Sequence, residues 1–299
     1  MPSTKWLRVI PLHLMLLPAL VLLLIYSYGP IVGILIAFED FMPSKGIFGS
    51  PLVGFDNFKY VWVLPDTKQV LTNTVVIALF KIVSNLTVPI ILALLLNEVR
   101  LQFFKRTVQT VIYFPYFLSW VLLGGILIDI LSPSEGIANE ILRLFGFEPV
   151  FFLGNPHWFR FTVIVTDVWK EAGFNTIVFL AAITNTNPSL YEAAVIDGAG
   201  RWKQTLHVTL PSMLPIIVLV ATLSLGNVLN AGFDQIFNLY SPQVYSTGDI
   251  LDTFVYRIGL VDTQYGVATA VGLFKSVVSC GLISISYLMA YRFANYRIF

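Results

Sequence analysis

Charge and cysteine are both scarce in this sequence. Only 12% of the 299 residues are charged, against roughly 25% in ordinary soluble domains, while 57% are hydrophobic and the mean hydropathy is +0.79. Because a soluble protein of this size needs a charged surface, lipid is the expected solvent. The single cysteine, Cys280, excludes an internal disulfide, and the three histidines lack the spacing of metal ligands. We expect no redox or zinc chemistry and no cofactor bound by this chain, and the net charge of +1 gives no sign of a nucleic-acid partner.

Long apolar runs are what the sequence has instead, and six of them can cross a membrane. A spanning helix needs about 20 mostly apolar residues, because the hydrocarbon layer is about 30 Å thick and each residue rises about 1.5 Å. The first run continues to about Phe38, which is too long for an export signal, so we expect it to stay as a span. The predicted spans are approximately 11–38, 73–96, 107–131, 158–183, 211–233 and 266–291, in a single membrane domain of residues 1–299.

Lysine and arginine are unevenly divided between the two sets of connecting segments. Short cytoplasmic loops of membrane proteins carry an excess of both residues. One set holds nine in short segments: Lys5, Arg8, Arg100, Lys105, Arg106, Arg201, Lys203, Arg292 and Arg297. The other set holds six in longer loops: Lys45, Lys59, Lys68, Arg143, Arg160 and Arg257. We therefore expect both termini in the cytoplasm, together with a cytoplasmic loop over residues 184–210.

That cytoplasmic loop has the pattern of a short helix, a break and a second helix. Asn187 is a good N-cap and Pro188 suits the first helical turn, whereas Gly198 can adopt the left-handed conformation that ends a helix. Pro211 is expected to end the second helix before the fifth span. Apolar residues recur on one face of that second helix, at Trp202, Leu206 and Leu210. The loop is suited to transmit force from a docked protein, although an ordinary interfacial linker would show the same helical pattern.

A spaced motif runs through the same loop. Glu192-Ala193-Ala194 is followed after three residues by Gly198 and, nine residues later, by Val208-Thr209-Leu210-Pro211. This run resembles the EAA signature of permeases in binding-protein-dependent ABC importers, with valine at 208 where isoleucine is usual. Segments 53–58, 169–174 and 197–199 resemble the carbohydrate-uptake branch of those permeases. Segments 113–120 and 252–257 are similar to permeases for oligosaccharide and polysaccharide import, alginate importers among them.

The resemblance implies an all-α integral membrane protein with the type I ABC importer permease fold, in the bacterial cytoplasmic membrane. It implies import of a carbohydrate, with an oligosaccharide expected, delivered by an extracytoplasmic solute-binding protein. Two ATP-binding subunits would hold ATP and magnesium, since this chain has no Gly-x-x-x-x-Gly-Lys-Ser/Thr phosphate loop. A second, similar but distinct permease is expected, although the sequence leaves two identical copies open. The residues implied to couple to the ATPase are Tyr191, Glu192, Ala193, Ala194, Asp197, Gly198, Ala199 and Arg201.

Polar residues within the predicted spans are the candidates for a substrate path, because such residues are costly in lipid. Asn227 and Asn230 are expected on one face of the fifth span, where their amides could bind sugar hydroxyls or join helices. Three lysines lie at similar predicted depths and could attract an anionic sugar, or could be neutralised by carboxylates. The candidates are Asn227, Asn230, Asp234, Trp169, Lys170, Lys81 and Lys275.

Two other classes of protein compete with this interpretation. A secondary transporter or channel could also have six spans, but would not need a loop that binds an ATPase. A membrane enzyme could use Asp167, Glu171 and His157 as acid–base groups. His157 lies fourteen residues from Glu171, about 21 Å along a helix, so these groups are poorly placed to act together.

Overall fold

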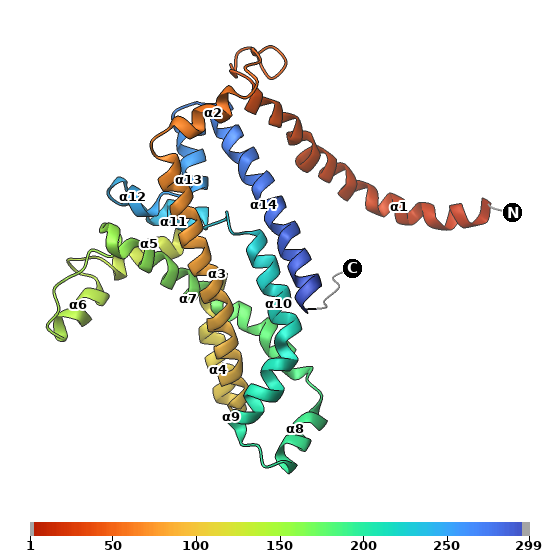
Figure 1. The fold of residues 1–299 in the computed structure, drawn as a ribbon, viewed down its shortest axis with the longest axis vertical. Coiled ribbons are helices and arrows are strands. Elements are labelled where there is room, and N and C mark those ends of the chain that lie inside the picture. The colour runs from red at the N-terminus through yellow and green to blue at the C-terminus, as the bar shows by residue number, and fades with distance from the viewer. Residues whose placement is uncertain (1–2, 295–299) are drawn as a thin grey trace. The chain divides into compact units, whose positions relative to one another are not determined.

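The computed structural model describes residues 3–294, most of which are helical (Figure 1). Arg297, which contributes to the charge count above, lies outside the described residues. The described chain divides into two compact units, one of residues 3–64 and 255–274, the other of residues 65–254 and 275–294. The last helix, α14 (Tyr265–Ala294), belongs in part to each.

The first unit contains the first apolar run and the loop that follows it. The run begins as α1 (Ser3–Leu23) and continues through a π-helical turn (Leu24–Tyr28) and a 3-10 segment (Gly29–Phe38), and α2 spans Asp56–Val63. A second π-helical turn covers Arg257–Val261. Asn57 Nδ2 donates to the backbone oxygens of Ala37 (3.0 Å) and Glu39 (2.9 Å), which ties α2 to the end of the run. The loop is therefore ordered by an internal hydrogen-bonded anchor.

The second unit is built on α3 (Thr67–Glu98) and α7 (Pro156–Thr184), which lie side by side (Figure 1). A buried cluster joins α3, α7 and α10: Ala93, Phe179, Ile183 and Met213. The remaining helices are α4 (Gln102–Tyr113), α5 (Trp120–Ile130), α6 (Ile137–Leu144), α8 (Pro188–Ile196), α9 (Arg201–Gln204), α10 (Leu210–Gly226), α11 (Phe233–Leu239), α12 (Tyr245–Gly248) and α13 (Leu251–Tyr256), the last of which runs into the first unit. Short 3-10 segments cover Phe114–Phe117 and Pro242–Val244, and a π-helical turn covers Thr205–Thr209.

Within residues 3–294, four helical segments are long and apolar enough to cross a membrane on their own: Pro11–Phe38, Thr67–Glu98, Arg201–Gly226 and Tyr265–Leu288. A fifth is possible where Gln102–Phe117 and Trp120–Ile130 meet at 106°. The region of the expected span over 107–131 is therefore a bent pair of helices and not one straight helix. Pro115 is the second residue of the 3-10 segment at the bend, and the Ser119 side chain caps the next helix by accepting from the Leu122 N–H. Helix α7 has 29 residues but carries four charged side chains, which lowers its apolar character.

Candidate functional site

The segment that carries the spaced motif forms the helix and break that the sequence predicts. Helix α8 begins at Pro188, with Asn187 Oδ1 accepting from the Ser189 N–H at 3.1 Å. It ends where Gly198 adopts a φ of +74°, and the Ala199 N–H bonds back to the Ala194 oxygen at 2.8 Å. The N-cap and the left-handed glycine are both confirmed.

The second helix differs from its prediction, because it does not end at Pro211. It runs without a break from Arg201 to Gly226. The π-helical turn at Thr205–Thr209 explains the continuity, since the Leu210 N–H bonds five residues back to Thr205. The widened turn directly before Pro211 accommodates a ring that an ordinary helical turn would exclude. The turn after α8 therefore leads into one long helix that has no second break before Gly226.

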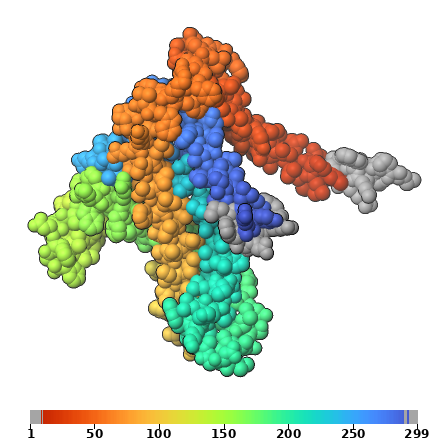
Figure 2. Space-filling view, in the orientation of Figure 1, coloured from red at the N-terminus to blue at the C-terminus, as the bar shows by residue number. Residues whose placement is uncertain are grey.

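Three side-chain contacts hold α8 and its turn against the rest of the unit. Tyr191 Oη and Thr209 Oγ1 are 2.9 Å apart, and Gln204 Nε2 donates to the Ala199 oxygen at 2.8 Å. Arg201 pairs with Glu98 at the end of α3, at 2.6 Å. Of the residues expected to couple to an ATPase, Tyr191, Glu192, Ala193 and Ala194 lie on α8, Asp197 caps it, Gly198 and Ala199 form the turn, and Arg201 begins α9. The segment forms one end of the second unit (Figure 2).

This end of the unit presents an apolar surface with a groove. The exposed fractions are 62% for Val195, 86% for Ile196 and 73% for Trp202. A cavity of about 360 Å³ lies between α8 and the following helix, lined in part by Ala193 and Ala194. Small side chains beside exposed apolar ones suit close contact with another protein. We refer to residues 187–211 as the coupling segment.

A second feature, the polar cavity, lies among α3, α7 and the end of α10. It has a volume of about 260 Å³. Its lining consists of Ala78, Lys81, Ile82, Asn85, Asp167, Glu171, Asn175, Ser224, Asn227, Asn230, Ala231 and Gly232. The sequence predicted Lys81, Asn227 and Asn230 as path residues, and the structure brings these three together. Lys170, Lys275, Trp169 and Asp234 are not among its lining residues.

The expected fifth span, 211–233, is broken at this cavity. Helix α10 ends at Gly226 and α11 begins at Phe233, so the expected shared helical face of Asn227 and Asn230 is wrong. Gly232 has a φ of +96°, and a Cβ atom there would lie 2.8 Å from Lys81 Nζ. Lys81 also donates to the Ala231 oxygen at 2.8 Å. A backbone carbonyl released by unwinding is therefore satisfied by a lysine from another helix, which local sequence could not show.

Lys81 is the centre of a buried network. Its Nζ lies 2.9 Å from Asp167 Oδ1, with exposed side-chain fractions of 8% and 13%. It also donates to Gln235 Oε1, while Gln235 Nε2 donates to the Val163 oxygen at 2.7 Å. Asn85 Nδ2 donates to Asp167 Oδ2 at 2.8 Å. Asn85 and Gln235 were not predicted as path residues from the sequence. Both are polar residues in apolar surroundings, which is the same signal that indicated Asn227 and Asn230.

The other two lysines are also bound to carboxylates. Lys170 Nζ lies 3.2 Å from Glu171 Oε1 and 5.1 Å from the centre of the Tyr116 ring. Lys275 Nζ lies 2.5 Å from Asp252 Oδ1. Each of the three lysines therefore has its own carboxylate partner, and the charges around the polar cavity compensate one another.

Trp169 and Asp234 occupy other surroundings in the second unit. The Trp169 side chain is 49% exposed on α7, and Asp234 lies in the first turn of α11, where its backbone oxygen accepts from Asn238 at 2.7 Å. Among residues 3–294, three or more His, Cys, Asp or Glu residues do not gather as a metal site would require.

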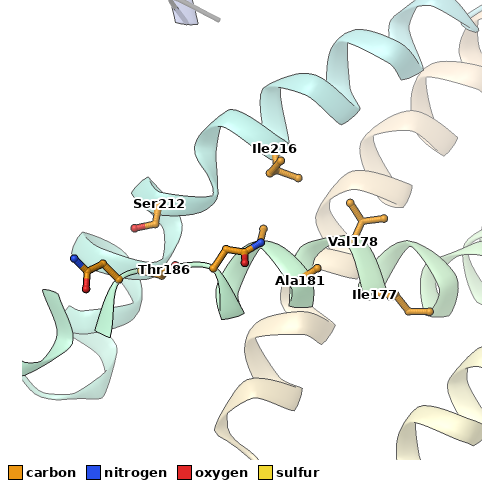
Figure 3. Close-up of a pocket in the computed structure, with 9 residues that line it drawn as sticks. Ile177, Val178, Ala181, Thr186, Ser212 and Ile216 are labelled. Atoms are coloured by element: carbon orange, nitrogen blue, oxygen red, sulfur yellow. The ribbon is translucent and has the colours of Figure 1, made fainter. Parts of the chain in front are cut away.

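A third cavity, of about 690 Å³, lies on the flank of α7 and α10 (Figure 3). Ile177, Val178 and Ala181 line it from α7, and Ser212 and Ile216 from α10. Its lining is mostly apolar and includes Thr186, a buried residue in the connection to α8. None of the predicted path residues lies here, so the polar cavity is the better candidate for a hydroxyl-rich ligand.

Residues 86–288 match the family model of the binding-protein-dependent transport system inner membrane component. The chain belongs to this family. The permease is 41% identical over 288 residues to the polygalacturonan/rhamnogalacturonan transport system permease protein YteP of Bacillus subtilis (strain 168), covering 96% of this chain and 90% of the relative. It is 30% identical over 271 residues to the arabinooligosaccharides transport system permease protein AraP of the same strain, covering 89% and 84%.

Solved structures agree with this assignment. The permease superposes with a TM-score of 0.90 on a chain of a bacterial ABC transporter involved in the import of the acidic polysaccharide alginate, at 37% identity and with 97% and 98% of the two chains covered. A second structure, the alginate transporter with an alginate pentasaccharide-bound periplasmic protein, gives a TM-score of 0.91 at 36% identity, covering 99% of both chains. The expected all-helical permease of type I fold, in the bacterial inner membrane, is confirmed. The permease is a transport component and not an enzyme.

Proposed function

We propose that this permease carries an oligosaccharide across the bacterial cytoplasmic membrane through the polar cavity, after delivery by an extracytoplasmic binding protein. The observation that carries the proposal is the charge-compensated, amide-lined cavity at the break in the fifth span. Broken helices at binding sites are a recurring device of transporters, because irregular backbone is tolerated only where it lines a cavity. The similar permeases named for polygalacturonan and arabinooligosaccharides, and the alginate transporter, support a carbohydrate.

We further propose six crossings in one membrane domain of residues 1–299, with both termini in the cytoplasm. Helix α7 is long enough to span at 29 residues, and its internal lysine is paired with Glu171. The bent α4–α5 pair supplies another crossing. With the four long apolar segments, these make six. The excess of Lys and Arg in the short loops supports the orientation, which puts the coupling segment on the cytoplasmic side.

The proposed role of the coupling segment is to seat α8 in a cleft of an ATP-binding subunit. Two such subunits would hold ATP and magnesium, and a second, distinct permease would complete the pathway. The exposed Ile196 and the small residues Ala193 and Ala194 support a docked protein surface. The unbroken helix from Arg201 to Gly226 would carry motion from the ATPase to the polar cavity at its other end.

The transport proposal is tested by co-purifying the permease with its partners and reconstituting the complex in liposomes. The probes are trigalacturonate, an alginate trisaccharide and arabinotriose, each with the binding protein present. We expect at least one of them to be taken up and to raise ATP hydrolysis. Uptake without any ATP-hydrolysing partner would replace this proposal with a secondary transporter, and the absence of uptake of all three would contradict the substrate class.

The docking proposal has its own test. A photoreactive crosslinker placed at Ala193, which is exposed on α8, should label an ATP-binding subunit from the cytoplasmic side. Labelling from the outer side, or of no nucleotide-hydrolysing neighbour, would contradict both the orientation and the docking role.

A further inference from the structure

Four asparagine side chains line the polar cavity, and three of them, Asn85, Asn227 and Asn230, have one end of the amide already engaged. Asn85 Nδ2 donates to Asp167 Oδ2 at 2.8 Å. Because a carboxylate only accepts, the nitrogen of Asn85 must face Asp167 and the oxygen is left over. Asn85 Oδ1 is buried and has no hydrogen-bond partner within residues 3–294. Asn227 Nδ2 likewise donates to a backbone oxygen, that of Leu223, at 3.3 Å, which leaves its oxygen as an acceptor.

Asn230 is turned the other way. Its Oδ1 accepts from Lys275 Nζ at 2.6 Å. An ammonium group only donates, so the amide oxygen of Asn230 must face Lys275 and the NH2 group is left over. Lys275 is itself held by Asp252, 2.5 Å away. The ion pair of Lys275 with Asp252 thus fixes the orientation of the Asn230 amide. Lys275 itself is not among the residues that line the cavity.

We propose that Lys275 is a positioning residue that turns Asn230 so that its N–H donates to a sugar oxygen, while Asn85 and Asn227 accept from sugar hydroxyls. This inference rests on the proposed function, since it assumes that the sugar passes through the polar cavity. It also names the part of the sugar that this subunit recognises. The cavity is suited to hydroxyl groups and not to carboxylates, because its cation, Lys81, is already paired with Asp167, and the other polar groups of its lining are amides, the Ser224 hydroxyl and the Glu171 carboxylate.

A purely structural role for Lys275 is the competing explanation, since the lysine neutralises Asp252 whatever Asn230 does. The two roles predict different combined effects of substituting Lys275 and Asn230. If Lys275 acts on the sugar through Asn230, removing both side chains should weaken binding no more than removing Asn230 alone. If Lys275 only supports the fold, the two losses should add.

The test measures the dissociation constant of the purified permease–ATPase complex in nanodiscs for trigalacturonate and for its methyl ester, which has the same ring hydroxyls without the negative charges. We expect Asn230→Leu, Lys275→Met and the double variant each to raise this constant about tenfold, for both probes alike. Lys275→Arg retains a donor for Asn230 and should remain within about twofold of the parent. Lys59→Met, which breaks an exposed pair with Asp56, is the control and should bind as the parent does.

A second variant keeps the test decisive if Lys275→Met folds poorly. Asn230→Asp retains an oxygen for Lys275 and replaces the NH2 donor with a charged oxygen that only accepts, so it should also weaken binding of the uncharged methyl ester about tenfold. Parent-like binding by Asn230→Asp, or a loss of about a hundredfold in the double variant, would overturn the inference. If substituting Asn85, Asn227 and Asn230 by Leu together leaves the constant unchanged, the failure lies with the proposed path itself.

Discussion

Two of the left-handed glycines in the described residues, Gly198 and Gly232, lie in the two breaks discussed above, and their surroundings are opposite. Gly198 has a φ of +74°, and a Cβ atom there would meet nothing within 4 Å. Gly232 has a φ of +96°, and a Cβ atom there would lie 2.8 Å from Lys81 Nζ. The first break is a local stop signal in an exposed segment. The second is held open by a buried lysine from a helix about 150 residues away in the chain.

This difference indicates different roles for the two breaks. An exposed break with small neighbours presents backbone and apolar side chains to a partner, whereas a buried break presents unwound backbone and amides to a cavity. The first needs only its own residues, and the second needs Lys81, Asp167 and Gln235 to satisfy one another. Substitutions at the buried break should therefore lower the stability of the permease far more than substitutions at the exposed break. Substitutions at the exposed break should instead weaken its coupling to the partner.

The largest expected effect is that of Lys81→Met, because it leaves Asp167 buried without its ion partner. We expect a loss of about 3–5 kcal/mol in the free energy of unfolding. The measurement is thermal unfolding of the detergent-solubilised permease, followed by the fraction that remains monodisperse. Adding Asp167→Asn should recover part of the loss, because it removes the orphaned charge. Parent-like unfolding of Lys81→Met would mean that the buried break does not depend on this network.

The two glycines provide a direct comparison through Gly198→Ala and Gly232→Ala. Both variants place a side chain at positive φ, which costs about 1–2 kcal/mol. Only Gly232→Ala also displaces the Lys81 ammonium group, so its total loss of stability should be larger, about 3 kcal/mol. The same unfolding measurement compares them. Equal losses in the two variants would show that the contact with Lys81 contributes nothing.

Gly198→Trp should affect stability little and coupling strongly. Its backbone strain is about 1–2 kcal/mol, and a Cβ atom at this position would meet nothing within 4 Å. With an ATP-binding subunit docked on α8, the ring would prevent close approach, so we expect sugar-stimulated ATP hydrolysis to be abolished while the complex still inserts in the membrane. Gly146, with a φ of +79° and nothing within 4 Å, offers a matched control outside the coupling segment. Co-purification of the ATPase should be retained in Gly146→Trp, and normal stimulation in Gly198→Trp would refute the docking role.

The sequence predicted the features that depend on neighbouring residues better than those that depend on distant contacts. The Asn187 cap and the Gly198 stop depend on neighbouring residues, so the pattern predicted them correctly. The continuation of the helix through Pro211 was missed, because the π-helical turn before it has no simple sequence signal. The break after Gly226 was also missed, since the side chain that bonds to its unwound backbone, Lys81, is far away in the chain. Sequence reasoning did identify Asn227 and Asn230 as path candidates, since polarity in an apolar run is visible without knowing the helix geometry.

The smallest effect should come from the ion pair that fastens the exposed region, Arg201 with Glu98. The two atoms are 2.6 Å apart, but the side chains remain 57% and 47% exposed, so water and salt screen the pair. We expect Arg201→Ala to lower the free energy of unfolding by less than about 1 kcal/mol. The difference from the parent should shrink further when unfolding is repeated at high salt, whereas the loss in Lys81→Met should persist because burial protects that pair from screening. A loss in Arg201→Ala that matches Lys81→Met and does not respond to salt would show that the coupling segment, too, depends on a contact made across the fold.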